Sequence, residues 1–224
     1  MQNLTHWEQE WSRIQKELRQ HPGVRVLRDT QGPVLQDAAP PDPPGNPEDH
    51  PYLDPSLYER SVLFSEIGSQ WQTVDPYPTV NGEFFLTPLS KTVRENSPSF
   101  PPDLYSDEEQ RVGAELHVID DAPFTGAGSF AAIRIQPGVT TSEIWFSDHV
   151  RGLWQMDLDY NTYVERLRLT KGAFGWQHLY TEAPLNDWEF EPTADRIARM
   201  FDVLPQMFPD YDYSDLRARL EARL

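Results

Sequence analysis

The chain has 224 residues, of which 36 are Asp or Glu and 19 are Lys or Arg, so its formal net charge is −17 at pH 7. A charge of this sign repels phosphate backbones and anionic membranes, which argues against nucleic-acid or membrane binding and favours a basic partner, although it also serves simple solubility. The absence of cysteine excludes disulfides, thiolate zinc sites and cysteine nucleophiles. The 7 Trp, 9 Tyr and 11 Phe supply enough apolar area for a packed core.

The first residues carry neither the basic segment nor the apolar stretch with which a secretory signal begins. No apolar run approaches the roughly 20 residues needed to cross a bilayer. We therefore expect a cytoplasmic protein.

Residues 5–20 are predicted to form an amphipathic helix. Thr5 and Glu8 have the spacing of a capping box, and Pro22-Gly23 ends the pattern. The apolar residues at helical spacing are Trp7, Trp11, Ile14 and Leu18. We expect the two tryptophans to anchor this helix to the chain's own core, with a partner-binding helix as the alternative.

A proline-rich connector is predicted at residues 31–55, after a short strand at 24–27. It holds eight of the 21 prolines, and proline fixes φ and removes backbone donors, so the segment is expected to be extended. A polyproline ligand for an aromatic groove is the alternative. The elements expected next are a short helix at 56–68 capped by Ser56, a strand at 82–87, a second proline-rich connector at 98–107 and a strand at 115–120.

Three strands separated by short turns are predicted in the segment 129–157, which indicates an antiparallel meander. Their ranges are 129–136, 143–148 and 152–157. Helices follow at 160–171, stopped by Gly172, and within the C-terminal segment 193–224, where Thr193 and Ser214 are the expected caps. With no repeat and no domain boundary, residues 1–224 are predicted to form a single α+β domain.

The sequence gives little support for a catalytic site. The six histidines lack the spacing of a helical metal pair, and Gly126-Ala-Gly128 precedes a strand without the Lys-Ser/Thr of a phosphate loop. No catalytic residue, metal or cofactor is therefore predicted, and the protein is expected not to be an enzyme. The alternative is a hydrolase whose site is assembled from His117, Asp120, Asp148 and His149.

The residues expected to contact a partner lie in and after the meander. Trp145 and Phe146 point to opposite faces of their strand, and an exposed aromatic among acidic residues is typical of an interface hot spot. Asp148 is also expected to accept backbone hydrogen bonds in a turn, and Asp157 and Asp159 to cap the next helix. The predicted partner-binding residues are Glu143, Trp145, Asp148, Asp157 and Asp159.

Three motifs occur in an order that resembles the SUKH superfamily of fungal cell-wall-assembly regulators and bacterial immunity proteins. They are Gly126-Ala-Gly-Ser-Phe-Ala-Ala-Ile-Arg-Ile135, Glu143-Ile-Trp-Phe-Ser-Asp-His149 and Tyr160-Asn-Thr-Tyr-Val-Glu-Arg-Leu167. The resemblance covers residues 80–182. The helix pair that usually precedes this region is not evident, and residues 31–68 take its place.

The resemblance implies a twisted antiparallel sheet with helices packed around it. It also implies a non-enzymatic immunity or regulatory protein that binds and neutralises a toxin, often a nuclease, inside the producing cell. A basic nuclease would be attracted by the acidic chain. The alternatives are the hydrolase above and a structural scaffold module that uses the Trp7/Trp11 helix; the oligomeric state is left open.

Overall fold

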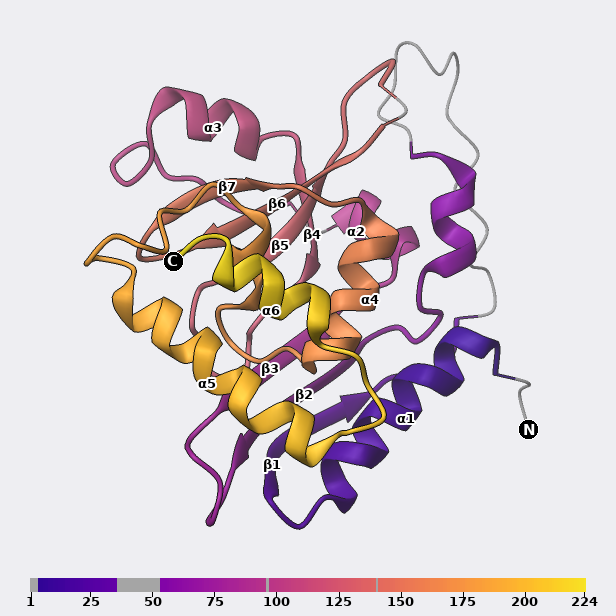
Figure 1. Cartoon of the computed structure of the whole chain (residues 1–224). Helices are drawn as coiled ribbons and strands as arrows, with labels where there is room; N and C mark the ends of the chain where they lie inside the picture. The colour runs from indigo at the N-terminus through magenta and orange to yellow at the C-terminus, as the bar shows by residue number, and fades with distance from the viewer. Residues whose placement is uncertain (1–3, 36–52, 96, 140) are drawn as a thin grey trace.

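The protein folds around one antiparallel sheet whose strands follow chain order, β1-β2-β3-β4-β5-β6-β7 (Figure 1). The computed structural model describes residues 4–35, 53–95, 97–139 and 141–224. The strands in these residues are β1 Val24–Gln31, β2 Ile67–Thr73, β3 Asn81–Leu86, β4 Leu116–Asp120, β5 Phe130–Arg134, β6 Glu143–Asp148 and β7 Gly152–Met156. All neighbouring pairs are antiparallel, which confirms the predicted α+β class and the meander at β5–β7.

Helices pack on both faces of the sheet, but unequally. Figure 1 shows α1, α4 and α6 over one face, with α5 beside them, while α3 stands apart at the far end of the sheet. The α-helices are α1 His6–Gln20, α2 Leu89–Glu95, α3 Asp107–Gly113, α4 Tyr160–Thr170, α5 Glu191–Met207 and α6 Ser214–Glu221, and the 3-10 helices are η1 Pro55–Arg60 and η2 Trp176–Tyr180. No helix in the described ranges has the length and apolar character needed to traverse a membrane.

The N-terminal helix α1 forms as the sequence predicts. The backbone N–H of Thr5 donates to the carboxylate of Glu8 at 3.0 Å, which closes the capping box. Trp11 is fully buried and its ring lies 5.2 Å from that of Phe84 on β3. Trp7 instead lies on the rim of the core, within cation–π distance of two arginines. Trp11 therefore anchors the helix to the chain's own core.

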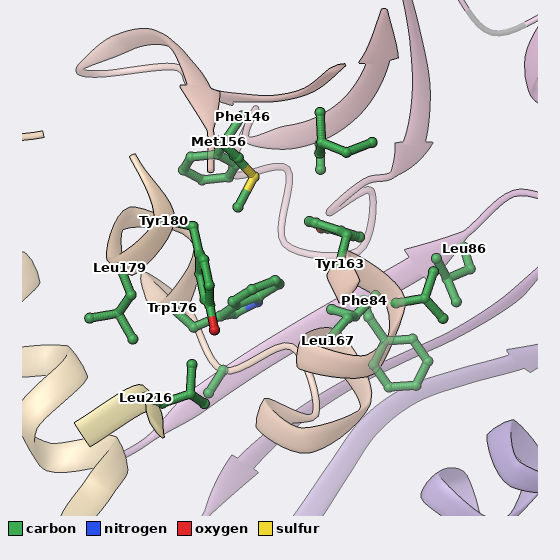
Figure 2. Close-up of a cluster of buried hydrophobic side chains, with 14 of the residues drawn as sticks. Phe84, Leu86, Phe146, Met156, Tyr163, Leu167, Trp176, Leu179, Tyr180 and Leu216 are labelled. Carbon is green, nitrogen blue, oxygen red and sulfur yellow. The ribbon is translucent and has the colours of Figure 1, made fainter. Parts of the chain in front are cut away.

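The main core lies between the sheet and the helices α1, α4, η2, α5 and α6. Figure 2 shows Trp176 and Tyr180 of η2 beside Tyr163 of α4, and Trp176 lies 5.2 Å from Tyr163 between ring centroids. Met156 and Phe146 enter this cluster from β7 and β6 (Figure 2). Large side chains from β6 and β7 thus pack against the aromatic side chains of α4 and η2.

A smaller apolar cluster lies on the opposite face of the sheet. Val112 of α3 packs there with Leu116 and Ala132, and the partly buried Trp145 covers them. Phe146, the next residue, is buried in the main core. The prediction that Trp145 and Phe146 face opposite ways is therefore confirmed.

The predicted helix at 56–68 is wrong in most of its length. Only a 3-10 turn forms at η1, where the Asp54 carboxylate, and not Ser56, accepts the capping N–H. The chain is then extended, because Val62 and Phe64 alternate into the core and Phe64 bridges Val34. The following strand β2 carries no prediction from the sequence.

Two predicted helix caps are also wrong. Thr193 lies inside α5, which begins at Glu191 with Pro192 in its first turn, and Pro205 lies within the same helix. Ser214 is the first residue of α6, and Tyr213 holds the cap position. The short helices α2 and α3 were not predicted, and residues 36–52 of the proline-rich connector lie outside the described residues.

Candidate functional site

A cavity of about 290 Å³ opens where β4 and β6 end and β5 begins. Its walls come from β3, the end of β4, the 121–129 link, β5, β6, the β6–β7 turn, the segment 174–178 and the first turns of α5. The charged and imidazole side chains in this lining are Glu83, Asp120, Asp121, Asp148, His178 and Arg196. Acidic groups therefore outnumber the single Arg.

The chain after α4 is held against β3, and this brings the segment 174–178 to the cavity. Lys171 and Gly172 both adopt left-handed φ values, of 54° and 71°, which turns the chain out of the helix. The Glu83 N–H then donates to the carbonyl of Gly172 at 2.9 Å. A Cβ at position 172 would lie 2.3 Å from the Glu83 carbonyl oxygen, so only glycine allows this approach.

Asp120 is one of two buried acids of the cavity, and like Glu83 it has 4% of its surface exposed. Its Oδ2 accepts a hydrogen bond from the Tyr163 hydroxyl at 2.7 Å, and its Oδ1 accepts one from the Phe85 N–H at 2.8 Å. Burial raises the pKa of Asp120 to about 7, against the effect of these two donors, and the charges of Asp121 and Glu83 raise it further. No Lys, Arg or His in the described ranges forms an ion pair with Asp120.

Glu83 organises the loop that forms one wall of the cavity. Its two carboxylate oxygens accept the N–H groups of Phe124 and Thr125, at 2.6 and 2.9 Å. The loop continues through Gly126 and Gly128, whose left-handed φ values of 65° and 70° favour glycine. These bonds fix the wall beside Asp120 and leave Glu83 without a cationic partner in the part of the chain that the structure describes.

Asp148 and His178 form a hydrogen-bonded pair at the other side of the cavity. The Asp148 Oδ2 lies 3.0 Å from the His178 Nε2, and the Asp148 Oδ1 accepts the N–H of Val150 at 3.0 Å. Burial alone would raise the pKa of Asp148, but these bonds and the charges of His178 and Arg151 outweigh burial and hold the pKa below its usual value. The expectation that Asp148 accepts a backbone hydrogen bond in a hairpin turn is confirmed.

The structure separates the five residues predicted to bind a partner. Asp148 lies at the cavity, whereas Glu143 and Trp145 lie on the opposite face of β6, where Glu143 accepts the Trp145 indole N–H at 2.9 Å. Asp157 is exposed, with 88% of its side chain accessible. Asp159 caps α4, as expected, by accepting the N–H of Thr162 at 2.7 Å.

The alternative hydrolase site is assembled only in part. Asp120 and Asp148 line the same cavity, but the Nδ1 of His117 lies 3.2 Å from a carbonyl of α2, and His149 is exposed outside the lining. The imidazole in the cavity belongs to His178, which carries no prediction from the sequence. No group of His, Asp and Glu side chains in the described ranges is arranged to hold a metal ion.

Of the six charged or imidazole residues in the lining, sequence reasoning missed four: Glu83, Asp121, His178 and Arg196. One of them had a local signal, because Glu83 is an acid within the otherwise apolar strand Gly82-Glu-Phe-Phe-Leu86. His178 had none, since its partner Asp148 lies 30 positions earlier in the chain. Only the folded chain brings these groups together.

Comparison with family models, with curated proteins and with solved structures finds no match to this chain. The likeness of residues 80–182 to the SUKH superfamily therefore stays a prediction.

Proposed function

We propose that this protein is a non-enzymatic binding protein of the immunity or regulatory type, which binds a basic protein through the face that contains the cavity. The observation that carries the proposal is the cavity lining: four carboxylates meet there, and Arg196 is the only Lys or Arg among the lining residues. The cytoplasm is the proposed location, where a toxin nuclease is the proposed type of partner.

Electrostatics supports a basic partner over an acidic one. The formal net charge of −17 attracts cations at long range and accelerates their association. At short range the carboxylates of the cavity lie between apolar walls, where the effective dielectric constant is lower than in water and charge interactions are stronger. Both effects favour a basic partner surface and reject an acidic one.

Two exposed apolar side chains lie on chain segments joined beside the cavity. Val150, in the β6–β7 turn, is 85% exposed and Trp188 is 77% exposed. Arg151 joins their segments, because it donates to the carbonyl of Glu189 and lies 4.3 Å over the ring of Phe190. Val150 lines the cavity, and the exposed Trp188, on the segment bonded to Arg151, supplies the kind of aromatic anchor that interface hot spots commonly have.

A pair of double variants with equal charge change tests the proposal. Asp121→Asn with Asp148→Asn removes two charges from the cavity, and Glu59→Gln with Glu221→Gln removes two exposed charges elsewhere. A protein captured from the native extract and released by salt is purified, and its Kd for each variant is measured. We expect the cavity variant to weaken binding at least tenfold and the control variant by less than threefold, on the order expected for charge pairs at an interface. Equal losses for both variants, or no basic partner at all, would contradict the proposal.

A hydrolase is the second candidate, because Asp120 and Asp148 line one cavity while their environments move their pKa values in opposite directions. Two such carboxyls are what acid–base catalysis requires. A panel of ester, glycoside and phosphoester substrates tests this candidate. Turnover abolished by Asp120→Asn would support it, and no turnover on any substrate of the panel would count against it.

A further inference from the structure

The cavity presents hydrogen-bond acceptors that the described protein leaves partly unused. A carboxylate accepts about four hydrogen bonds, whereas Asp120 and Glu83 each accept two from the described chain. The four donors are neutral N–H and O–H groups, so no positive charge within the described ranges is paired with either carboxylate. The carboxylates of Asp120 and Glu83 can therefore accept further hydrogen bonds from a ligand.

His178 adds one more polar atom without a partner among the described residues. The ring is 1% exposed and lines the cavity, and its Nδ1 has no hydrogen-bond partner among the described residues. Its Nε2 already lies 3.0 Å from the Asp148 carboxylate. The Nδ1 is therefore the ring nitrogen that remains without a partner at the cavity.

The apolar part of the lining is aromatic and suits a cationic ligand that carries an alkyl chain. Phe130, Phe146 and Phe174 all contribute to the walls. Aromatic rings attract cations and also accommodate the methylene groups of an alkyl chain. A ligand with an alkyl stem and a cationic head matches both the walls and the acceptors.

We propose that the cavity binds a primary ammonium group on an alkyl chain, as a lysine side chain of the basic partner presents it. The identity of the partner rests on the proposed function, but the cation site does not. Asp120 is the counter-ion, and Glu83 and Asp121 supply further acceptors around it.

An ammonium group fits these acceptors better than a guanidinium group. Guanidinium binds best side-on to a carboxylate with two free oxygens. Each oxygen of Asp120 and of Glu83 already accepts one bond from the chain. A compact ammonium with three rotatable donors instead reaches the remaining lone pairs of separate carboxylates.

The bound cation is coupled to the ionisation of Asp120. Because burial raises the pKa of this carboxyl to about 7, part of the population is neutral at neutral pH, and a cation binds the ionised form preferentially. The titratable groups around it are Tyr163 of α4, Glu83 of β3 and the adjacent Asp121, with Asp148, His178 and Arg196 elsewhere in the lining. Affinity is therefore expected to rise between pH 6 and pH 8, with release of a proton on binding.

The test uses the full chain and small probes: n-butylammonium, n-butylguanidinium and butyrate, each titrated by NMR at pH 8. We expect n-butylammonium to bind most tightly. Asp120→Asn should lower the affinity for n-butylammonium at least tenfold and abolish its pH dependence. Arg196→Gln removes the only Lys or Arg side chain among the lining residues, and should raise that affinity by about threefold. Glu59→Gln, an exposed control away from the lining, should change the affinity by less than twofold.

Preference for butyrate, with weaker binding after Arg196→Gln, would overturn the proposal in favour of an anion site. Tighter binding of n-butylguanidinium would overturn the choice of ammonium, and absence of binding by every probe would overturn the cation site. Probe binding without any protein partner would contradict only the proposed function. Partner binding that is insensitive to both Asp120→Asn and Arg196→Gln would contradict only the cavity inference.

Discussion

Lys171 and Asp120 are both buried charged side chains, but their surroundings differ: one is paired with an opposite charge and the other, among the described residues, is not. Lys171 is fully buried, and its Nζ lies 3.0 Å from the Glu17 carboxylate and 4.1 and 4.3 Å from the ring centroids of Tyr211 and Phe208. Burial lowers the pKa of Lys171 to about 8, and Glu17 opposes that shift. The charge is thus matched by groups from α1 and from the segment between α5 and α6.

Asp120 is buried to a similar degree, yet the described chain supplies it with neutral donors alone. The two sites also differ in access, since Asp120 lines a cavity whereas Lys171 has no exposed surface. A buried charge that is paired within the chain joins segments of the fold. A buried charge that faces a cavity without an ionic partner is available to a ligand.

The largest expected effect comes from breaking the pair at Lys171. Glu17→Gln leaves the buried ammonium without its carboxylate, and should lower the free energy of unfolding by about 3 kcal/mol at pH 7. This loss should shrink towards pH 10. Folding lowers the pKa of Lys171 to about 8, so above that pH the buried amine is increasingly neutral in the folded protein and needs no carboxylate partner. Urea denaturation at both pH values measures it.

An exposed pair provides the control for this prediction. Glu165 lies 3.2 Å from Arg60, with both side chains about half exposed. Glu165→Gln should therefore change stability by less than about 1 kcal/mol. If Glu17→Gln were no worse than this control, Lys171 would not depend on Glu17.

At Asp120 the removal of the charge should have the opposite effect. The folded state keeps the proton of Asp120 to a higher pH than the unfolded state, so its contribution to stability declines as pH rises from about 4 to about 7. Asp120→Asn should abolish that decline, and above pH 7.5 the variant should be more stable by on the order of 2 kcal/mol. Denaturant titrations from pH 4 to pH 8 measure the difference.

Asp148 is the matched control, because its pKa is lowered on folding. Asp148 therefore stabilises the folded protein at every pH above the pKa that it has in the unfolded chain, and this contribution is lost only as the pH falls below that pKa. Asp148→Asn should therefore destabilise the protein at neutral pH. If Asp120→Asn and Asp148→Asn changed the free energy of unfolding in the same direction, the two carboxyls would not differ in the way described.

A smaller effect is expected when Asp120 loses one neutral donor. Tyr163→Phe removes the hydroxyl that lies 2.7 Å from the carboxylate, and should cost about 1–2 kcal/mol at pH 8, where Asp120 is mostly ionised. Tyr180→Phe is the comparison, since that hydroxyl lies 3.4 Å from the half-exposed Asp215. Thermal denaturation measures both variants. An equal decrease in Tm would show that the hydrogen bond to Asp120 contributes no more to stability than the bond to Asp215.

The smallest effect is expected at Asp157, one of the residues that the sequence assigned to the partner surface. Its side chain is 88% exposed and its nearest basic group is Arg219 at 3.8 Å. Asp157→Lys should change stability by less than about 0.5 kcal/mol and should slow association with a basic partner in a salt-dependent way. Stopped-flow rates at low and high salt measure this, and a change in dissociation instead would place Asp157 inside the interface.

The sequence predicted elements whose signals are local. Thr5 and Glu8 mark the start of α1, and the turns between β5, β6 and β7 mark a meander. Strand β2 lacks such a pattern, because Gly68 and Ser69 are buried where apolar residues would be expected. Gly68 is small since a Cβ there would lie 2.8 Å from the Phe84 carbonyl oxygen, a contact that only the folded sheet reveals.

The candidate site was less predictable than the fold. Asp148 was singled out by its place in a turn, but its partner His178 lies on a 3-10 turn whose position depends on the approach of Gly172 to β3. Spacing along the chain also grouped Glu143 with Asp148, although they lie on opposite faces of β6. The alternation of a strand could have separated these two, whereas no local pattern joins Asp148 to His178.

NMR titration of the Asp120 side-chain carboxyl carbon shows whether this residue holds a charge for a ligand. The signal is assigned by its loss in Asp120→Asn and followed from pH 4 to pH 9, with and without saturating n-butylammonium. We expect the Asp120 carboxyl to have a pKa of about 7 in the free protein and a clearly lower pKa when n-butylammonium is bound. A pKa near the ordinary 3.8, or one that n-butylammonium leaves unchanged, would contradict this expectation.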